Sequence, residues 1–268
     1  MIARGLFLLA LLCAGPVAAQ QAVHVPVDGV QLSAQLWRPA GAGRVPAVAI
    51  FHGCGGVGIN NTRMAGLLRD WGYAALVVDS FTARHMVDVC GRHWPTQEDA
   101  DKRVRDIDAS LAWLTKQAFV DGNRRGYIGY SYGGGVALLR AFEPREPRVR
   151  AAILAYPDCG LGGPLGSTPQ PRQPTMFALG ALDDWTPAAQ CQALIDRVSA
   201  SRELIETHVY AGAHHSFDAL GLPVRYLEGV GNRSKPGGCC GAHYGANEAA
   251  WKAFVADARA FLARTLTP

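Results

Sequence analysis

The stretch Tyr127-Ile-Gly-Tyr-Ser-Tyr-Gly-Gly-Gly135 contains the pattern Gly-x-Ser-x-Gly, formed by Gly129, Ser131 and Gly133. It follows a short apolar run and leads into the run Val-Ala-Leu-Leu at 136–139, which is typical of a helix. A serine at such a strand–turn–helix junction is held on a strained turn with its hydroxyl exposed. Glycine is needed on either side because the strand and the helix approach too closely for a Cβ atom. The pattern is common by chance, but this setting indicates a nucleophilic serine.

An acid that could support this serine follows a later strand-like run. Residues 174–179 are mostly apolar and lead into Gly180-Ala-Leu-Asp-Asp-Trp-Thr-Pro187. An acid placed just after a strand, before a proline that can begin a helix, lies at the carboxyl edge of a parallel sheet. Asp183 and Asp184 both flank this turn, so the residues themselves leave either one open as the acid.

A histidine that could act as the base follows the last strand-like run. Residues 204–210 alternate like a strand and lead into Ala211-Gly-Ala-His-His-Ser-Phe-Asp218. The chain order of Ser, acid and His is one of the known orders of a catalytic triad. His214 and His215 are adjacent and usually point apart, so only one of them can reach the serine.

A glycine-rich loop near the start of the chain predicts an oxyanion hole. The buried-strand pattern of residues 47–51 ends in His52-Gly-Cys-Gly-Gly56. Backbone N–H groups in such a loop can turn toward the charge of a tetrahedral intermediate. We expect the two donors to be the N–H groups of Cys54 and Tyr132, the residue after the serine. Cys54 could itself be a nucleophile, but no strand–turn–helix elbow surrounds it.

Together these motifs resemble the dienelactone hydrolase family of α/β-hydrolases, in its secreted bacterial branch. The resemblance implies that Asp183 is the triad acid, because a proline lies four residues later, and that His215 is the base, because the family reads His-x-Phe there. The enzymes that name the family use a cysteine nucleophile where this chain has Ser131. The expected activity is therefore that of a broader carboxylic-ester hydrolase. The matching segments are 52–56, 78–81, 129–134, 180–187 and 213–218.

The alternation of short apolar strands with helical runs predicts an α/β-hydrolase fold, with a mostly parallel central sheet and helices on both faces. An antiparallel pair is expected first, at 22–26 and 30–38, joined at Asp28-Gly29. Further strands are expected near 47–51, 73–78, 126–130, 151–156, 174–179 and 204–210, and helices near 62–71, 98–119, 132–142, 187–199 and 246–266.

Three long loops follow strand ends and are expected to build the substrate pocket: 82–97, 158–171 and 219–244. Ligands of open α/β sheets bind at this edge. Tyr130, Trp185 and Phe217 lie close in sequence to the candidate catalytic residues, so they are candidates to line an apolar pocket or to pack around the serine. No insert is large enough to suggest an all-helical lid.

The beginning of the chain predicts a signal peptide over residues 1–19. Arg4 precedes a short apolar run, and Val17 and Ala19 fit the small-residue positions before a cleavage site. The remaining residues, 20–268, are enough for a single α/β domain. A secreted or periplasmic location is expected, with no membrane attachment once the signal peptide is removed. The formal net charge of +4 is too mild to predict a nucleic-acid partner.

Six cysteines remain after residue 19, and an even number in an oxidising compartment favours disulfides. Six cysteines allow 15 pairings, so sequence does not decide between them. The preferred pairs join loops at the edge of the site: Cys54 with Cys90, and Cys159 with Cys191. Cys239 and Cys240 then remain as an adjacent pair or as free thiols. With His243 they lack the spacing and the fourth ligand of a zinc site.

The function predicted from these residues is hydrolysis of a small-molecule carboxylic ester through an acyl-enzyme. Ser131, Asp183 and His215 form the triad, and the chemistry needs no metal or organic cofactor. A thioesterase, a peptidase or a polyester hydrolase would use the same groups. The alternative from another class is a secreted binding protein on an inactive hydrolase fold, which would require a missing triad member. The oligomeric state is not predicted.

Overall fold

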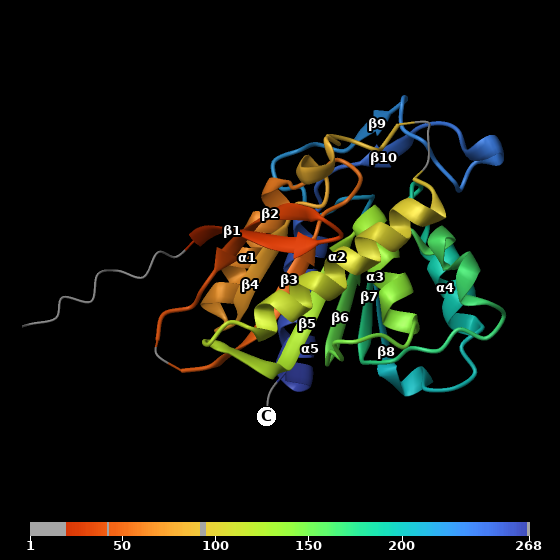
Figure 1. Ribbon diagram of the computed structural model, residues 1–268. Coiled ribbons are helices and arrows are strands. Elements are labelled where there is room, and N and C mark those ends of the chain that lie inside the picture. Colours follow the sequence, from red (N-terminus) through yellow and green to blue (C-terminus); the bar gives the residue numbers. More distant parts are fainter. Residues whose placement is uncertain (1–19, 42, 92–94, 267–268) are drawn as a thin grey trace, which may run out of the picture.

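The protein is built around an eight-stranded sheet (Figure 1). The computed structural model describes residues 20–41, 43–91 and 95–266. The strand order is β1-β2-β4-β3-β5-β6-β7-β8, in which β1 and β2 are antiparallel and the strands from β3 onward are parallel. The strands are β1 (Gln20–Val27), β2 (Val30–Trp37), β3 (Val45–Phe51), β4 (Ala74–Val78), β5 (Val120–Tyr130), β6 (Ala151–Ala155), β7 (Thr175–Gly180) and β8 (Ile205–Tyr210).

Helices cover both faces of this sheet, which confirms the expected fold class. Buried side chains of α2, α3 and α4 pack in one apolar cluster with one face of the strands, and those of α1 and α5 pack in a second cluster with the other face. The helices are α1 (Ile59–Asp70), α2 (Gln97–Thr115), α3 (Tyr132–Phe142), α4 (Ala188–Asp196) and α5 (Glu248–Leu266).

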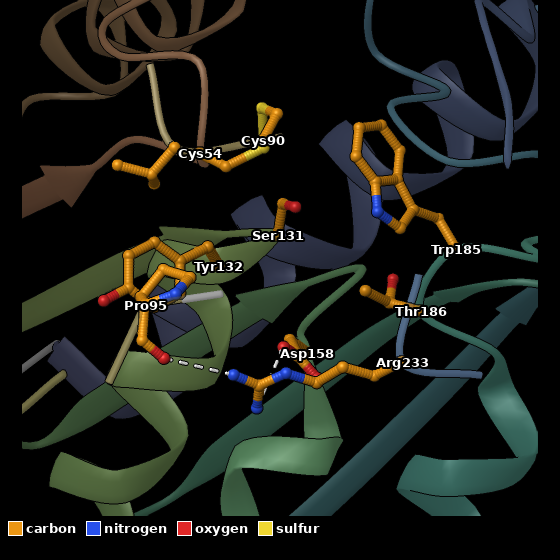
Figure 2. A pocket seen from close by; sticks show the side chains of 10 residues that line it. Cys54, Cys90, Pro95, Ser131, Tyr132, Asp158, Trp185, Thr186 and Arg233 are labelled. Atoms are coloured by element: carbon orange, nitrogen blue, oxygen red, sulfur yellow. Dashed lines mark hydrogen bonds and ion pairs between the residues drawn. A yellow bond between two sulfur atoms is a disulfide. The ribbon is translucent and has the colours of Figure 1, made fainter. Parts of the chain in front are cut away.

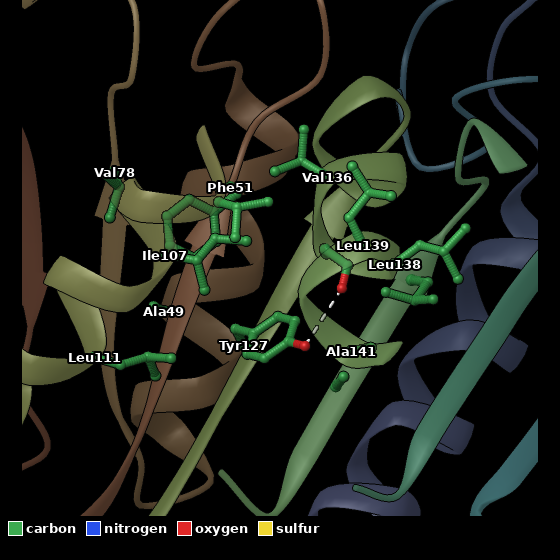
Figure 3. Close-up of a cluster of buried hydrophobic side chains, with 14 of the residues drawn as sticks. Ala49, Phe51, Val78, Ile107, Leu111, Tyr127, Val136, Leu138, Leu139 and Ala141 are labelled. Carbon is green, nitrogen blue, oxygen red and sulfur yellow. Dashed lines mark hydrogen bonds between the residues drawn. The ribbon is translucent and has the colours of Figure 1, made fainter. Parts of the chain in front are cut away.

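Strand β3 shows why the central strands read as continuous apolar runs. Ala49 and Phe51 belong to the cluster with α2 and α3, whereas Val48 and Ile50 belong to the cluster with α1 and α5. A parallel strand covered on both faces needs apolar residues at every position. Burial also explains the helical period of the apolar residues in α2, since Ile107 and Leu111 both point into the first cluster (Figure 3).

The sequence was less informative where tertiary pairing overrides local pattern. The second helix was expected to reach residue 119 and the next strand to begin at 126, but α2 ends at Thr115 and β5 begins at Val120. The first residues of β5 are polar, and Val120 pairs with Val45 of β3. The region 219–244, expected as a loop, also contains a small antiparallel pair, β9 (Arg225–Leu227) and β10 (Ala242–Tyr244).

The junction of β5 and α3 is the tightest part of the fold. Ser131 has φ 54° and ψ −120°, a conformation that L residues rarely adopt. A Cβ atom on Gly129 would overlap Gly133 and Ala137 of α3, and a Cβ atom on Gly133 would overlap the carbonyl oxygens of Phe51 and His52. Tyr127 fastens the same strand to the helix by donating a hydrogen bond of 3.3 Å to the carbonyl of Ala137 (Figure 3).

Three disulfides lie in the described part of the chain, and two of them are the preferred pairs. Cys54 is bonded to Cys90, which joins the loop after β3 to the loop after β4. Cys159 is bonded to Cys191 and so joins a 3-10 helix after β6 to α4. The adjacent Cys239 and Cys240 form the third. Disulfides of this kind fit an oxidising compartment.

The expected signal peptide, 1–19, lies outside the described residues. Within residues 20–266, apart from the short undescribed segments, no helix combines the length and the apolar character needed to cross a bilayer.

The close approach at Gly133 predicts a large loss of stability in Gly133→Ala. The new methyl group would displace the backbone carbonyls of Phe51 and His52, and such overpacking costs about 1–3 kcal/mol. The matched control is Gly163→Ala, because Gly163 is exposed and its Cβ would meet nothing within 4 Å. Urea unfolding should show a reduced free energy of unfolding for the first variant alone. Equal stabilities of the two variants would contradict the close contact.

Candidate active site

Ser131 is presented at the carboxyl edge of the sheet by the turn between β5 and α3. Its backbone N–H donates to the carbonyl of Ala155 at 3.0 Å, and its own carbonyl accepts from the N–H of Gly135 at 2.9 Å. These bonds tie the turn to β6 on one side and to α3 on the other. The strained backbone of Ser131 is therefore held from both directions, and its Oγ atom lines two adjoining cavities.

His215 lies within hydrogen-bond distance of both Ser131 and Asp183. Its Nε2 atom is 2.8 Å from Ser131 Oγ, and its Nδ1 atom is 2.8 Å from Asp183 Oδ2. The imidazole is buried, and the rings of Tyr156 and Trp185 lie against it with centroid distances of 4.8 Å each. These contacts leave the ring little freedom to turn away from the serine.

Asp183 is held by the residues that directly follow it. Its Oδ1 atom accepts from the backbone N–H groups of Trp185 at 2.9 Å and Thr186 at 2.8 Å. The hydroxyl of Thr186 lies 3.0 Å from Asp183 Oδ2 and 3.1 Å from His215 Nδ1. The sequence analysis did not single out Thr186, although its place three residues after the acid is a usual one for such a turn.

The neighbouring residues Asp184 and His214 are turned away from this chain of contacts. Asp184 accepts from the backbone N–H of His243 at 2.8 Å, and its second oxygen lies 2.8 Å from the His243 ring. The ring of His214 lies 5.5 Å from that of His243. The sequence motifs alone left open which of two adjacent acids and which of two adjacent histidines approaches the serine. The structure brings Asp183 and His215 to Ser131.

Cys54 and Tyr132 line the same cavity as Ser131. Tyr132 is the first residue of α3, and the first N–H groups of a helix have no partner within it. The carbonyl of Cys54 accepts from the N–H of Val89 at 2.9 Å, and its sulfur is bonded to Cys90. Figure 2 shows Cys54, Ser131 and Tyr132 around one cavity. The loop that carries Cys54 is thus fastened at two points.

His52 supports the same loop from inside the core. It is fully buried, its Nε2 atom accepts from the N–H of Ser80 at 3.1 Å, and its Nδ1 atom lies 2.7 Å from the carbonyl of Gly53. Burial, with a smaller contribution from the nearby charge of Arg103, lowers the pKa of His52 to about 3. The imidazole is therefore neutral at pH 7, with its proton on Nδ1 facing Gly53.

Two adjoining cavities meet at Ser131. The larger, about 340 Å³, has Asn60, Asp88 and Tyr244 among its polar lining residues. The narrower one is lined by Val89, Pro95 and Trp185, among others, and Figure 2 shows Pro95 and Trp185 at its sides. Trp185 lines both cavities, and Tyr130 lines the larger.

Phe217, a candidate pocket residue in the sequence analysis, takes no part in either cavity. It is 0 % exposed and packs against the rings of Tyr156, Tyr210 and Phe254. Its side chain belongs to the buried apolar cluster that includes Trp251 and Phe254 of α5. The expectation that Phe217 lines the pocket is therefore corrected.

Asp158 and Arg233 form a charged wall of the narrower cavity that the sequence analysis missed (Figure 2). An Arg233 nitrogen lies 3.8 Å from Asp158 Oδ2, and another donates to the carbonyl of Pro95 at 3.3 Å. Burial raises the pKa of Asp158. Both residues fall in loops that were expected to build the pocket, but no local pattern marked them.

In the described part of the chain, no cluster of three or more His, Cys, Asp or Glu side chains is placed to hold a metal ion.

Comparison with known proteins identifies similar chains. Residues 32–261 match the model of the dienelactone hydrolase family. A Bradyrhizobium protein described as "Probable 2-oxo-3-(5-oxofuran-2-ylidene)propanoate lactonase" is 28 % identical over 207 residues, which cover 73 % of this chain and 82 % of that protein. A carboxymethylenebutenolidase of Pseudomonas putida is 28 % identical over 201 residues, covering 71 % and 82 %. The crystal structure of a dienelactone hydrolase from Anabaena variabilis has a TM-score of 0.64 at 21 % identity, covering 92 % of this chain and 98 % of that one.

The lowered pKa of His52 predicts that acid destabilises the protein through this residue. Between pH 6.5 and about 3 the unfolded chain binds a proton at His52 that the folded protein does not bind. The free energy of unfolding therefore decreases as the pH is lowered, by on the order of 3 kcal/mol between pH 7 and pH 4. His52→Gln has no proton to bind and should lose less stability between pH 7 and pH 4.

Urea unfolding at the two pH values measures this loss. His24→Gln is the control, because His24 is exposed on β1, and it should lose as much stability on acidification as the unmodified protein. The same loss in His52→Gln and in the unmodified protein would show that His52 is not held neutral by the fold.

Proposed function

This chain belongs to the dienelactone hydrolase family, and we propose that it is a secreted serine hydrolase that cleaves carboxylic esters. The observation that carries the proposal is the unbroken series of contacts from Asp183 through His215 to Ser131, with both imidazole nitrogens 2.8 Å from their partners. A positioned base beside a serine, with an acid that orients the base, is the arrangement that activates a hydroxyl for attack on an acyl carbon.

In the proposed first step, His215 Nε2 takes the proton of Ser131 as the serine oxygen attacks the ester carbonyl. The bond from serine to the acyl carbon forms, and the carbonyl oxygen takes the negative charge. When the tetrahedral intermediate collapses, the bond to the alcohol breaks and the alcohol leaves with the proton from His215. Water then attacks the acyl-enzyme by the same route, which releases the acid and restores Ser131.

Asp183 has a supporting role in this mechanism. Its Oδ2 atom holds the proton of His215 on Nδ1, so that Nε2 is free to accept a proton from the serine, and its charge stabilises the imidazolium that forms. The two N–H bonds on Oδ1 keep the carboxylate in position. The proposed mechanism needs no group from outside the chain other than water.

The negative oxygen of the intermediate requires donors that are already in place. We assign this role to the N–H groups of Cys54 and Tyr132, which flank Ser131 in the same cavity. A donor of this kind lowers the barrier by about 3 kcal/mol when it points to the charge before the reaction begins. The Cys54–Cys90 bond and the hydrogen bond from Val89 support the proposal, because both fix the backbone that presents one donor.

The proposed substrates are linear esters and lactones. Both curated relatives carry names of lactone-cleaving enzymes, and a lactone is a cyclic ester that the same steps would open. Of the two cavities that meet at Ser131, the larger one, about 340 Å³, would hold most of the substrate.

Secretion is part of the proposal. It is supported by the leader-like composition of residues 1–19, with Arg4 before an apolar run, and by the disulfides of the described chain. Structural disulfides persist in the periplasm and outside the cell and are rare in the cytosol.

A fluorophosphonate probe tests the proposed nucleophile. The unmodified protein should be labelled at Ser131 and should hydrolyse p-nitrophenyl esters, whereas Ser131→Ala should lose labelling and several orders of magnitude of turnover, down to the residual rate of triad variants. The labelled residue is identified by peptide mass spectrometry. If the folded alanine variant keeps most of its activity, Ser131 is not the nucleophile, and absence of labelling in the unmodified protein would favour a binding protein.

The choice between adjacent acids is tested by a matched pair of variants. Asp183→Asn should lower kcat by on the order of 10⁴-fold, because the amide would hold the imidazole in the wrong tautomer. Asp184→Asn should have a mild effect, because Asp184 contacts His243 rather than His215. Steady-state hydrolysis of a p-nitrophenyl ester measures both, and the reverse ranking would transfer the role of the acid to Asp184.

A further inference from the structure

A buried arginine lies directly behind the loop that carries Cys54. Arg103, on α2, is 4 % exposed, and its Nη2 atom donates to the backbone carbonyl of His52 at 2.7 Å. That carbonyl belongs to the peptide that begins the glycine-rich loop after β3. The same carbonyl is the one that a Cβ atom on Gly133 would strike, so Arg103 holds the point where the loop and α3 touch.

The guanidinium of Arg103 also contacts the other side of the proposed oxyanion hole. Its central carbon lies 4.8 Å from the ring centroid of Tyr132 and 5.2 Å from that of Phe81. A cation over an aromatic ring is attracted to its face, and the attraction is strongest where water is excluded. One buried side chain therefore contacts both segments that carry the proposed donors, one through a hydrogen bond and the other through a ring.

Among the described residues, no carboxylate is paired with Arg103 alone. Asp106, whose charge favours the protonated guanidinium, is paired with Arg84 at 2.7 Å, and Asp79 accepts hydrogen bonds from the backbone of Phe81 and from Thr82. The Nε and Nη1 atoms of Arg103 are buried with no partner among the described residues. Burial lowers the pKa of Arg103, but a guanidinium stays protonated in proteins.

This arrangement is unfavourable for stability alone. A buried charge without a paired charge costs folding free energy, and an apolar side chain of similar size would fill the same space at less cost. The neighbouring His52 is neutral, so it adds no second cation. What the arrangement does provide is a fixed positive charge behind the two proposed donors, where negative charge would develop during attack by Ser131.

We propose that Arg103 is a positioning residue for the oxyanion hole: it fixes the His52 carbonyl against α3 so that the N–H of Cys54 is held beside that of Tyr132. Its charge also favours the negative oxygen over the neutral ester. This inference rests on the proposed function, because it assumes that an ester is attacked by Ser131.

The test compares Arg103→Met, Arg103→Lys and Arg125→Met. Arg103→Met keeps the volume and removes the charge and the donor, so kcat for p-nitrophenyl acetate should fall about 10–100-fold while KM stays within about twofold, since the donors act on the transition state. Arg103→Lys keeps a charge and one donor and should restore kcat to within about fivefold of the unmodified protein. Labelling of Ser131 by the fluorophosphonate should slow in parallel with kcat.

Arg125→Met is the matched control. Arg125 is also buried, also donates to a backbone carbonyl, that of Arg148, and also has an unpartnered Nε atom among the described residues, but it lies at the middle of β5, away from Ser131, which follows the end of that strand. Its loss should lower Tm as much as the loss of Arg103 and leave kcat unchanged. If Arg103→Met does not fold, Arg103→Leu replaces it, because leucine also removes both the donor and the charge.

The outcomes separate this inference from the proposed function. If the unmodified protein does not react with the fluorophosphonate, the proposed function fails. If it reacts, and Arg103→Met or Arg103→Leu retains kcat within twofold, or Arg103→Lys is no better than these neutral variants, then the positioning role of Arg103 is wrong. A fall in kcat with unchanged KM, rescued by lysine and absent from Arg125→Met, supports it.

Discussion

The direct contact of the first turn of α3 with the end of β3 is the constraint on which the site depends. Gly133 has no side chain, so the helix can press its backbone against the carbonyls of Phe51 and His52. This contact brings Ser131 and the N–H of Tyr132 to the loop of Cys54. The sheet supplies the remaining groups, because parallel strands end at one edge and the turns after β7 and β8 place Asp183 and His215 there.

Buried polar groups keep this edge of the sheet in one arrangement. Asp183 is held by the residues that follow it, His52 is neutral and hydrogen-bonded at both nitrogens, and Arg103 fastens the His52 carbonyl. The disulfide at Cys54 limits the same loop from outside. Groups that are oriented before a reaction need not reorganise during it, so stability and the proposed chemistry depend on the same contacts.

Most of the fold could be predicted from the sequence because burial imposes a period on the chain. Helix α2 repeats its apolar residues toward one face, and β3 is apolar throughout because both of its faces are covered. The prediction was wrong where a segment depends on a distant partner. Strand β5 begins earlier than expected because Val120 pairs with Val45 of β3, and β9 and β10 are too short to show a period of their own.

The sequence by itself determined the order of the candidate groups and the need for glycine around Ser131, since both are properties of local spacing and backbone conformation. Only the tertiary structure decided that Asp183 and His215, rather than their neighbours, face Ser131, and that Phe217 packs in the core. It also revealed Thr186, Arg103 and the pair Asp158–Arg233. Adjacent residues share a turn, but their side chains point in different directions. A residue on a distant helix is brought to the site only by packing. Spacing along the chain therefore predicts neither the direction of a side chain in a turn nor the contacts of a distant residue.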